Sequence, residues 1–238
     1  MRIAVMSDIH GFNLALDAVL ADIAADEPFD EIIVAGDLVE GGPGPAQVIE
    51  RLRAGDLTVL RGNTDRDALL AAEERWDDRS YQYVYEQIGD EGLVYLASLP
   101  FSRRITPPSG TSPDDDLLVV HANPFDLERP LSPEMSDLEL RAVLGETRAA
   151  VIVFGHVHIA YTRQLGDRLL VDVSAVGNPK DQDLRCKYGV VIWDPATRAW
   201  SAEIRRIDYP LEETLTQIEE SSMPKPKKTR KKLLKASY

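Results

Sequence analysis

The feature of this chain that most constrains its fold is a regular alternation of short apolar runs with segments of helical periodicity. Three apolar runs rich in β-branched residues are typical of buried strands: RIAVMS (2–7), EIIVAG (31–36) and DLTVLRG (56–62). Helical spacing of apolar residues, or a helix-starting residue, follows each run and predicts helices over 13–25, 45–53 and 65–74. This β-α-β-α-β order predicts a largely parallel sheet with helices packed on its faces.

The later part of the chain continues this pattern and then changes it. We expect helical structure over 75–100, a turn-rich surface loop over 107–116, and buried strands in LLVVHAN and AAVIVF. After residue 158, four apolar stretches separated by turns predict a second, antiparallel sheet: YTRQL, DRLLVDVSAV, KYGVVIWD and RAWSAEIRRI. A short helix is expected near 210–220.

Length and composition suit one α/β domain, which we place over residues 1–222 of the 238. The single cysteine provides no disulfide framework, and the longest apolar runs are too short to span a bilayer. The first residues run directly into a predicted strand, without the pattern of a signal peptide. We therefore expect a soluble cytoplasmic protein.

The formal charge of −13 is distributed unevenly. Residues 223–238 hold seven Lys and Arg and no acid, which leaves 20 basic against 40 acidic residues elsewhere, a charge of −20. An acidic body is a poor surface for nucleic acid, but bound divalent cations would still allow a small phosphorylated substrate. We expect the basic tail over 223–238 to be disordered.

Polar residues that bind metals lie just after the predicted strands. All four histidines of the chain are among them. The complete set is Asp8, His10, Asp37, Asn63, His121, His156 and His158. Ligands of open α/β sheets bind beyond the carboxyl ends of the strands, so the topology predicts that these side chains meet in one site.

Taken singly, most of these residues allow a structural interpretation. Asp8 and His10 share a face if the chain is extended there, but Asp8 could instead cap a helix beside a surface histidine. Asp37 could be an ordinary loop acid, Asn63 part of a turn, and His121 a structural histidine. His156 and His158, two residues apart after Gly155, favour metal binding even alone.

Jointly, the order Asp-x-His, Gly-Asp, Gly-Asn, His and Gly-His-x-His resembles the calcineurin-like metallophosphoesterase superfamily. The resemblance covers roughly residues 1–195, and it is strongest to the compact prokaryotic phosphodiesterases and phosphatases. It implies a four-layer α/β/β/α sandwich with a dinuclear metal site at the strand ends. The periodicity by itself reaches only an α/β class with a later antiparallel sheet.

The resemblance also implies roles for individual residues. One ion would be held by Asp8, His10 and His158, and a second by Asn63, His121 and His156, with Asp37 bridging them. Mn, Fe, Zn, Co or Ni suit this ligand set, with Mn as the first choice. A hydroxide bridging the metals would attack phosphorus in line. The implied catalytic residues are Asp37, Asn63, Thr64 and Asp65.

The chain departs from the family pattern at Thr64. Many relatives carry a histidine at this position, which is thought to assist the leaving group. Threonine can donate a hydrogen bond but is no useful acid near neutral pH. We therefore hypothesise a preference for leaving groups that need little protonation, as in aryl esters, nucleotide diesters or pyrophosphate linkages.

Four further residues are candidates for substrate binding: Arg66, Asn123, Asp181 and Arg185. Arg66 could clamp a substrate phosphate or form a salt bridge on a helix surface. Asn123 could share the face of His121. Asp181 and Arg185 lie in a polar loop that approaches the site in relatives.

The function predicted from these observations is metal-dependent hydrolysis of a phosphodiester in a small, nucleotide-type substrate. The alternatives are a phosphomonoesterase or protein phosphatase, a dinucleoside polyphosphate hydrolase, and a non-catalytic scaffold of the same fold. No membrane contact is expected. A homo-oligomer stays open, because no seam for one is visible in the sequence.

Overall fold

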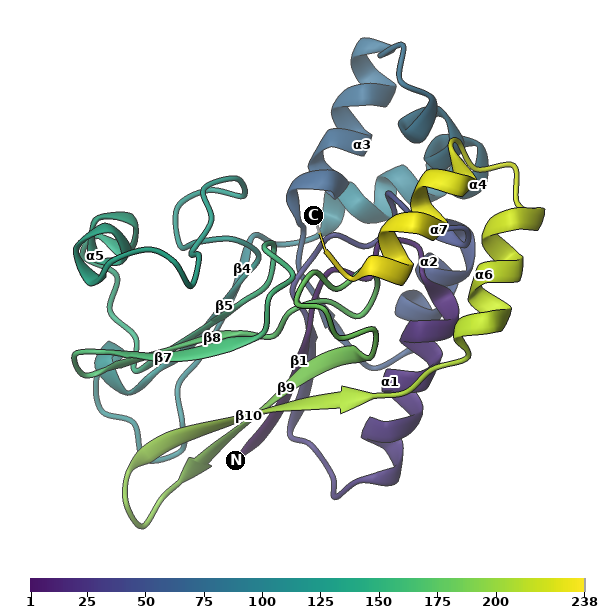
Figure 1. The fold of residues 1–238 in the computed structure, drawn as a ribbon. Helices are drawn as coiled ribbons and strands as arrows, with labels where there is room; N and C mark the ends of the chain where they lie inside the picture. Colours follow the sequence, from purple (N-terminus) through teal and green to yellow (C-terminus); the bar gives the residue numbers. More distant parts are fainter. Residues whose placement is uncertain (238) are drawn as a thin grey trace.

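Two five-stranded sheets stacked face to face form the centre of the protein in this computed structural model, which describes residues 1–237 (Figure 1). The first sheet has the order β10-β9-β1-β2-β3. Its strands are β1 (Arg2–Met6), β2 (Glu31–Val34), β3 (Thr58–Val59), β9 (Cys186–Asp194) and β10 (Ala199–Ile207). β1, β2 and β3 are parallel, as the β-α-β-α-β order predicts, whereas β9 and β10 run antiparallel to their neighbours.

The second sheet has the order β4-β5-β6-β8-β7. Its strands are β4 (Ser102–Ile105), β5 (Leu117–Val120), β6 (Val151–Phe154), β7 (Tyr161–Leu165) and β8 (Arg168–Asp172). β5, β6 and β8 are parallel, and β4 and β7 are antiparallel at the two edges. Both sheets are therefore mixed.

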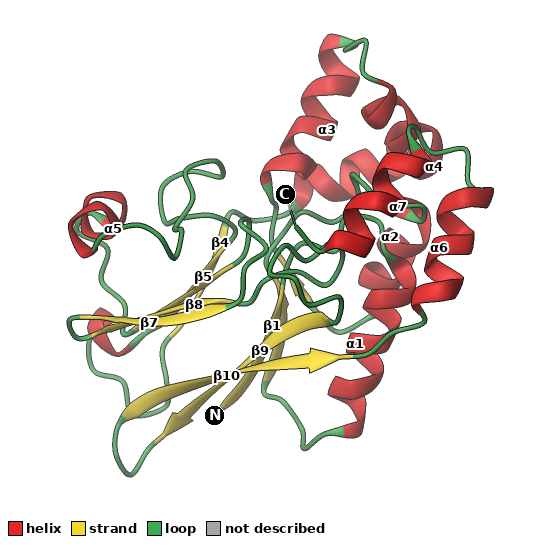
Figure 2. Ribbon diagram, in the orientation of Figure 1, coloured by secondary structure: helices red, strands yellow, loops and turns green. Residues whose placement is uncertain are grey.

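Helices cover the outer faces of the two sheets (Figure 2). One helix, α5 (Asp137–Leu144), lies on the outer side of the second sheet. The others gather on the outer side of the first sheet: α1 (Asn13–Ala25), α2 (Pro45–Ala54), α3 (Asn63–Glu74), α4 (Arg79–Ser98), α6 (Leu211–Glu220) and α7 (Pro226–Lys235). Among residues 1–237, no helix combines the length and apolar content that a bilayer span requires.

Three apolar cores define the layers, and strand alternation assigns residues to them. In β1, Ile3 and Val5 pack between the two sheets, whereas Ala4 and Met6 pack against the helices. On the far side, Leu140 of α5 belongs to a third core against the second sheet. The order of layers is helix, sheet, sheet, helix, which confirms the predicted α/β/β/α sandwich.

The predicted separate antiparallel sheet after residue 158 is wrong. The four strands divide instead, with β7 and β8 joining one sheet and β9 and β10 joining the other. β9 explains why. Tyr188 and Val190 pack in the helix-side core while Val191 packs between the sheets, so this strand is apolar on both faces. It needs a covering layer on each side, which the position beside β1 provides.

The basic segment expected to be disordered contains the helix α7, so that expectation is wrong for residues 226–235. Leu233 is 1% exposed in the helix-side core, and the preceding Met223 is also buried there. The amide of Gln182 donates to the carbonyl of Ala236, and Arg230 pairs with Glu219 of α6. A few apolar anchors thus outweigh the charge repulsion on which the expectation rested. The domain boundary at residue 222 stays a prediction.

Candidate metal centre

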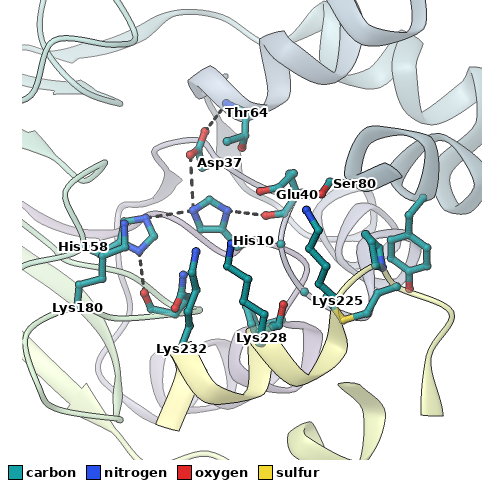
Figure 3. Close-up of a pocket in the computed structure, with 18 of the residues that line it drawn as sticks. His10, Asp37, Glu40, Thr64, Ser80, His158, Lys180, Lys225, Lys228 and Lys232 are labelled. Atoms are coloured by element: carbon teal, nitrogen blue, oxygen red, sulfur yellow. Dashed lines mark hydrogen bonds and ion pairs between the residues drawn. The ribbon is translucent and has the colours of Figure 1, made fainter. Parts of the chain in front are cut away.

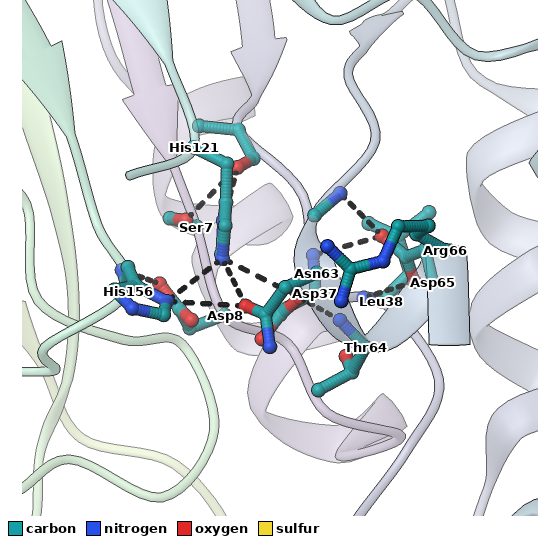
Figure 4. Close-up of polar contacts among 12 residues, drawn as sticks. Ser7, Asp8, Asp37, Leu38, Asn63, Thr64, Asp65, Arg66, His121 and His156 are labelled. Carbon is teal, nitrogen blue, oxygen red and sulfur yellow. Dashed lines mark hydrogen bonds and ion pairs between the residues drawn. The ribbon is translucent and has the colours of Figure 1, made fainter. Parts of the chain in front are cut away.

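The seven residues predicted to bind metal lie together at the carboxyl ends of strands from both sheets. Figure 3 shows His10 and His158, and Figure 4 shows the other five. Asp8 and His10 follow β1, Asp37 follows β2, and Asn63 begins α3 after β3. The second sheet supplies His121 after β5, and His156 and His158 after β6. The fold therefore brings the whole predicted set to one place. All but Asn63 and His156 are buried.

Asp8, His10 and His158 form the first of two clusters. The Nε2 atom of His158 lies 3.1 Å from Oδ1 of Asp8, and Nε2 of His10 lies 3.6 Å from the same oxygen. The two Nε2 atoms are 3.1 Å apart. Each of the three residues thus offers one potential ligand atom, and these atoms lie close enough together to hold a cation.

Asn63, His121 and His156 form the second cluster. The Nε2 atom of His121 is 2.9 Å from Oδ1 of Asn63 and 3.3 Å from Nδ1 of His156. Asp37 lies between the two clusters, with Oδ2 3.6 Å from Nε2 of His10 and Oδ1 3.4 Å from Nε2 of His121. Each cluster therefore has access to one oxygen of the same carboxylate.

Each of the four histidine rings has one nitrogen against a backbone carbonyl. The pairs are His10 Nδ1 with Glu40 at 2.6 Å, His121 Nδ1 with Ala35 at 2.9 Å, His156 Nε2 with Glu128 at 2.9 Å, and His158 Nδ1 with Asn178 at 2.7 Å. A carbonyl can only accept, so the proton of each neutral ring lies on that nitrogen. The other nitrogen then directs a lone pair inward, as in metal-binding histidines.

The convergence of lone pairs is a test of whether the site suits metal ions. Two inward lone pairs 3.1 Å apart, as in His10 and His158, repel each other unless a cation or a proton lies between them. The buried Oδ1 of Asp8 also has no hydrogen-bond partner among the described residues. Mixed nitrogen and oxygen donors without thiolate match the first-row divalent metals, so the residues present fit such ions.

The electrostatics of the centre likewise favour positive charge. Burial disfavours the imidazolium of His10, but the neighbouring carboxylate of Asp8 and the charges of Asp37 and Glu40 raise its pKa to about 9. Burial also disfavours the carboxylate of Asp8, yet His158 and His10 lower its pKa well below the usual range. The buried carboxylate of Asp8 is thus held ionised and is stabilised by a neighbouring positive charge.

The backbone at the centre has an unusual conformation. Five of the seven residues have positive φ: Asp8 (56°), His10 (52°), Asp37 (56°), His156 (72°) and His158 (60°). Non-glycine residues seldom adopt this region, and they cluster in it at functional sites. The prediction that the Asp8 and His10 side chains lie close together is therefore confirmed, but the predicted cause, an extended chain with both on one face, is wrong. They converge because the chain coils after β1.

Glycines allow the loops to approach each other closely. Gly36 has φ of 93°, and a Cβ atom there would lie 2.4 Å from the backbone nitrogen of Gly62. A Cβ atom at Gly155 would lie 2.2 Å from Oδ2 of Asp8. Larger residues would separate the strand ends and displace the carboxylates.

Asp65 and Thr64 support Asp37 in different ways. The carboxylate of Asp65 is buried and accepts hydrogen bonds from the amides of Asp37, Leu38 and Gly62, each at 2.9 Å. These contacts make Asp65 a positioning residue. The amide of Thr64 donates to Oδ1 of Asp37 at 2.9 Å, while its buried hydroxyl, at the cavity wall, has no partner among the described residues.

The four predicted substrate-binding residues do not line the cavity at this centre. Arg66 is paired with Asp67 and Glu128, which matches the salt-bridge alternative. Asn123 orders its own loop by accepting from the amides of Phe125 and Asp126. Asp181 pairs with Lys187, and Arg185 with Asp183.

Sequence reasoning missed much of the wall of the cavity, which has a volume of about 400 Å³. Glu40, Ser80 and Lys180 line it together with residues of α7 (Figure 3). The density of lysines in residues 223–238 was a usable signal for a basic surface beside the site. It was masked by the expectation of disorder.

The fold and the centre together define a metal-dependent phosphoesterase. The chain belongs to the calcineurin-like phosphoesterase family, whose model matches residues 1–160. This range contains all seven residues of the centre.

Two curated relatives extend the comparison. The symmetrical bis(5'-nucleosyl)-tetraphosphatase of Acidovorax ebreus is 31% identical over 157 residues, which cover 63% of this chain and 52% of that protein. The chain thus spans about half the length of this relative. An uncharacterized protein of Methanocaldococcus jannaschii is 26% identical over 243 residues and covers 93% of both chains.

Solved structures show the same fold over nearly the whole chain. A metallophosphoesterase from Sphaerobacter thermophilus has a TM-score of 0.77 at 22% identity and covers 99% of this chain and 100% of its own. A hypothetical protein from Pyrococcus horikoshii has a TM-score of 0.82 at 17% identity and covers 99% and 98%. At these identities the likeness concerns the fold.

Proposed function

We propose that this phosphoesterase hydrolyses a phosphodiester in a small nucleotide-type substrate and uses two divalent metal ions. The observation that carries the proposal is the pair of clusters that share Asp37 and point their histidine lone pairs inward. Such an arrangement has no structural purpose in a core, because it leaves buried polar atoms unpaired. It therefore argues against the non-catalytic scaffold.

In this proposal, Asp8, His10 and His158 would hold one ion, and Asn63, His121 and His156 the other, with Asp37 between them. Bound there, such ions polarise a phosphoryl oxygen and make water a stronger nucleophile at neutral pH. The backbone carbonyls that hold the four rings keep the ligand atoms aimed inward. Asp65 fixes the loop that carries Asp37.

Thr64 is the residue proposed to face the substrate. Its hydroxyl can donate a hydrogen bond to a phosphoryl or leaving-group oxygen, but it cannot deliver a proton near neutral pH. We infer that the substrate has a leaving group that is already stable as an anion, such as an aryl oxide or a phosphate.

A second candidate is hydrolysis of dinucleoside polyphosphates. The similarity of residues in the matched 157-residue region to symmetrical bis(5'-nucleosyl)-tetraphosphatases supports it. Cleavage within a polyphosphate releases a phosphate leaving group, which agrees with Thr64. Phosphomonoester or phosphoprotein hydrolysis is the remaining alternative, and no contact described above favours it.

The test uses metal-stripped protein supplied with Mn²⁺, Zn²⁺, Ni²⁺ or no metal. Activity is measured in parallel on p-nitrophenyl phosphate, bis-p-nitrophenyl phosphate and diadenosine tetraphosphate, with Asp37→Ala as the control. The proposal expects metal-restored cleavage of the diester or the tetraphosphate, and its loss in Asp37→Ala. Preference for the monoester would make the protein a phosphatase. Bound metal without turnover of any of the three substrates would instead favour the non-catalytic scaffold.

Thr64→His tests the role assigned to the threonine. A histidine there supplies a proton, so the variant should raise the rate on poor leaving groups relative to good ones by up to about 100-fold, the lower end of general-acid effects. The measurement compares kcat/KM for a series of aryl phosphate diesters of increasing leaving-group pKa. Equal slopes for variant and wild type would refute this role.

A further inference from the structure

The cavity at the metal centre has two chemically different walls. On one side lie residues of the centre, including His10, Asp37 and His158. On the other side lie four lysines, Lys180, Lys225, Lys228 and Lys232, which we call the lysine wall. Figure 3 shows the lysine side chains of α7 rising from the helix into the cavity toward His10 and Glu40. Three of these lysines come from the basic segment 223–238, which here packs against a body of net charge −20.

The position of the lysine wall is fixed by the packing of α7. Lys228 and Lys232 are four residues apart and share one face of the helix, and Lys225 immediately precedes the helix and lines the same cavity. The buried side chain of Leu233 sets the rotation of that helix against the body. The hydrogen bond from the Gln182 amide to the Ala236 carbonyl holds its end. The lysines are therefore directed at the cavity by a folded element.

The charges of three lysines of the wall are poorly compensated by the protein. Within residues 1–237, Lys225, Lys228 and Lys232 form no ion pair with a carboxylate at 4.0 Å or less. Lys232 also lies close enough to Lys180 for its charge to disfavour the second ammonium. Glu40 and Asp37 are the acids that line the cavity with these lysines. Burial raises the pKa of Glu40, and the charges of His10 and Lys232 only partly offset this. Two acids against four lysines leave an excess of positive charge.

We propose that the lysine wall binds a chain of linked phosphates that extends from the metal centre, so that the preferred substrate carries several phosphates. The inference rests on the proposed function for the position of the phosphate that is cleaved. An anion between the lysines would relieve their mutual repulsion and form charge-assisted hydrogen bonds with them. A diester with a single phosphate would be held at the centre and leave the lysines unused.

The spacing of the lysines agrees with an extended ligand. They span from Lys225 at the start of α7 to Lys232 two turns later, about 10 Å along the helix axis at 1.5 Å per residue. One phosphate cannot contact all of them, whereas a row of phosphates can. Inorganic tripolyphosphate, a nucleoside triphosphate and a dinucleoside polyphosphate share this chemistry.

The experiment compares two double variants of the full chain that change the same charge on the same helix. Lys228→Gln with Lys232→Gln removes two lysines of the wall. Lys227→Gln with Lys231→Gln removes two exposed lysines at the same spacing that do not line the cavity. Calorimetry measures the binding of inorganic tripolyphosphate without added metal. Kinetics with Mn²⁺ give kcat/KM for diadenosine tetraphosphate, ATP and bis-p-nitrophenyl phosphate.

We expect the wall variant to bind tripolyphosphate at least about tenfold more weakly than wild type, since two charge-assisted contacts are lost. Its preference for the tetraphosphate over the diester should fall by a similar factor, mainly through KM. The outer variant should keep both values, and Lys228→Arg with Lys232→Arg should restore most of the binding. If kcat/KM falls for both diadenosine tetraphosphate and ATP, the lysine wall recognises the phosphate chain, because the two substrates share that chain and only the first carries a second nucleoside.

Two results would overturn the inference. The first is equal binding of tripolyphosphate by the wall variant and the outer variant. The second is a wall variant that cleaves every substrate faster, which would make α7 a lid that blocks the centre. If tripolyphosphate binding depends on the wall but no phosphoester is cleaved with any metal, the binding site stands and the proposed function fails.

Discussion

The metal centre and the lysine wall face each other across one cavity, but they are fixed by different forces. At the centre, backbone carbonyls and amides hold buried side chains, and five residues adopt a strained left-handed conformation. Within the wall, Lys228 and Lys232 lie on the helical backbone of α7, which apolar anchors hold from beneath, whereas Lys225 precedes that helix with φ of 55° and Lys180 lies in a loop. The side chains of the first region are held at their polar atoms, whereas the lysines on α7 are held through the helix that carries them.

This difference suggests a division of labour. Transition-state stabilisation requires donors fixed to within fractions of an ångström, which the centre provides. Recognition of a flexible chain of phosphates requires charge at the right distance and tolerates mobile side chains. Changes at the centre should therefore lower kcat, and changes at the wall should raise KM.

The largest effect is expected from His158→Ala. Loss of a residue that only orients a metal ligand typically costs 10- to 100-fold, so loss of the ligand itself should lower kcat at least about 100-fold. Bound Mn should fall as well, as measured by elemental analysis of the dialysed protein. If His158→Ala keeps kcat and only raises KM, the expected difference between the metal centre and the lysine wall does not exist.

Gly155→Ala should disturb the centre without removing a ligand. The added methyl would lie 2.2 Å from Oδ2 of Asp8 and 2.4 Å from Oγ of Ser7. Overpacking of this kind destabilises by about 1–3 kcal/mol, which urea denaturation can measure. Gly55→Ala serves as a comparison, because Gly55 is exposed, has φ of −86°, and its Cβ would closely approach only the flexible side chain of Leu57, at 3.0 Å. If Gly155→Ala binds metal as tightly as wild type, the centre can accommodate the added methyl without displacing Asp8.

Asp172, on β8 below the centre, gives a prediction about pH. Burial, with no partner for Oδ2 among the described residues, raises its pKa well above 3.8. The unfolded chain therefore releases this proton first, and the group reduces stability as pH rises from about 4 toward the raised pKa. Asp172→Asn removes this loss, so its stability relative to wild type should grow with pH.

The expected gain of Asp172→Asn is about 1.4 kcal/mol for each pH unit within that window. Urea denaturation at pH 5 and pH 7 would measure it. Asp194 provides the opposite sign, since hydrogen bonds from Ala196 and Thr197 lower its pKa. The ionised Asp194 therefore stabilises the folded protein above about pH 4, and Asp194→Asn should lose this stabilisation. A pH-independent difference for Asp172→Asn would mean that Asp172 is ionised in the folded protein.

The smallest effect is expected from Leu233→Ala, which loosens the base of the wall. Leu233 is 1% exposed, whereas its neighbour Leu234 is 40% exposed and provides the control. Local fraying of α7 should raise KM for diadenosine tetraphosphate by several-fold, within the tenfold expected for the wall variant. The melting temperature of the body should change little, because α7 is a terminal element. If Leu233→Ala and Leu234→Ala have equal KM values, the packing of α7 does not position the lysines.

The two regions also differ in how far the sequence predicted them. His121 and the Gly155–His158 segment follow apolar runs, so pattern and topology together place them at one edge. The coiled backbone at Asp8 and His10 was not predictable, because only the folded loops force aspartate and histidine into positive φ. Nor was the pairing of β9 with β1, since periodicity gives a strand its faces but not its neighbours. α7 was missed because charge density dominates composition, while a single leucine decides its packing.

The four carbonyls that hold the histidine rings have a consequence for how this protein can vary. In many metal sites the ligand rings are steered by carboxylate side chains, which a point mutation can remove. Here the steering groups are peptide oxygens of Glu40, Ala35, Glu128 and Asn178, and every amino acid supplies such an oxygen. A substitution at any of these four positions therefore leaves the steering oxygen in place, provided that the main chain keeps its course. The path of the loops sets the orientation of the rings, so no particular residue type at these four positions reveals it in the sequence.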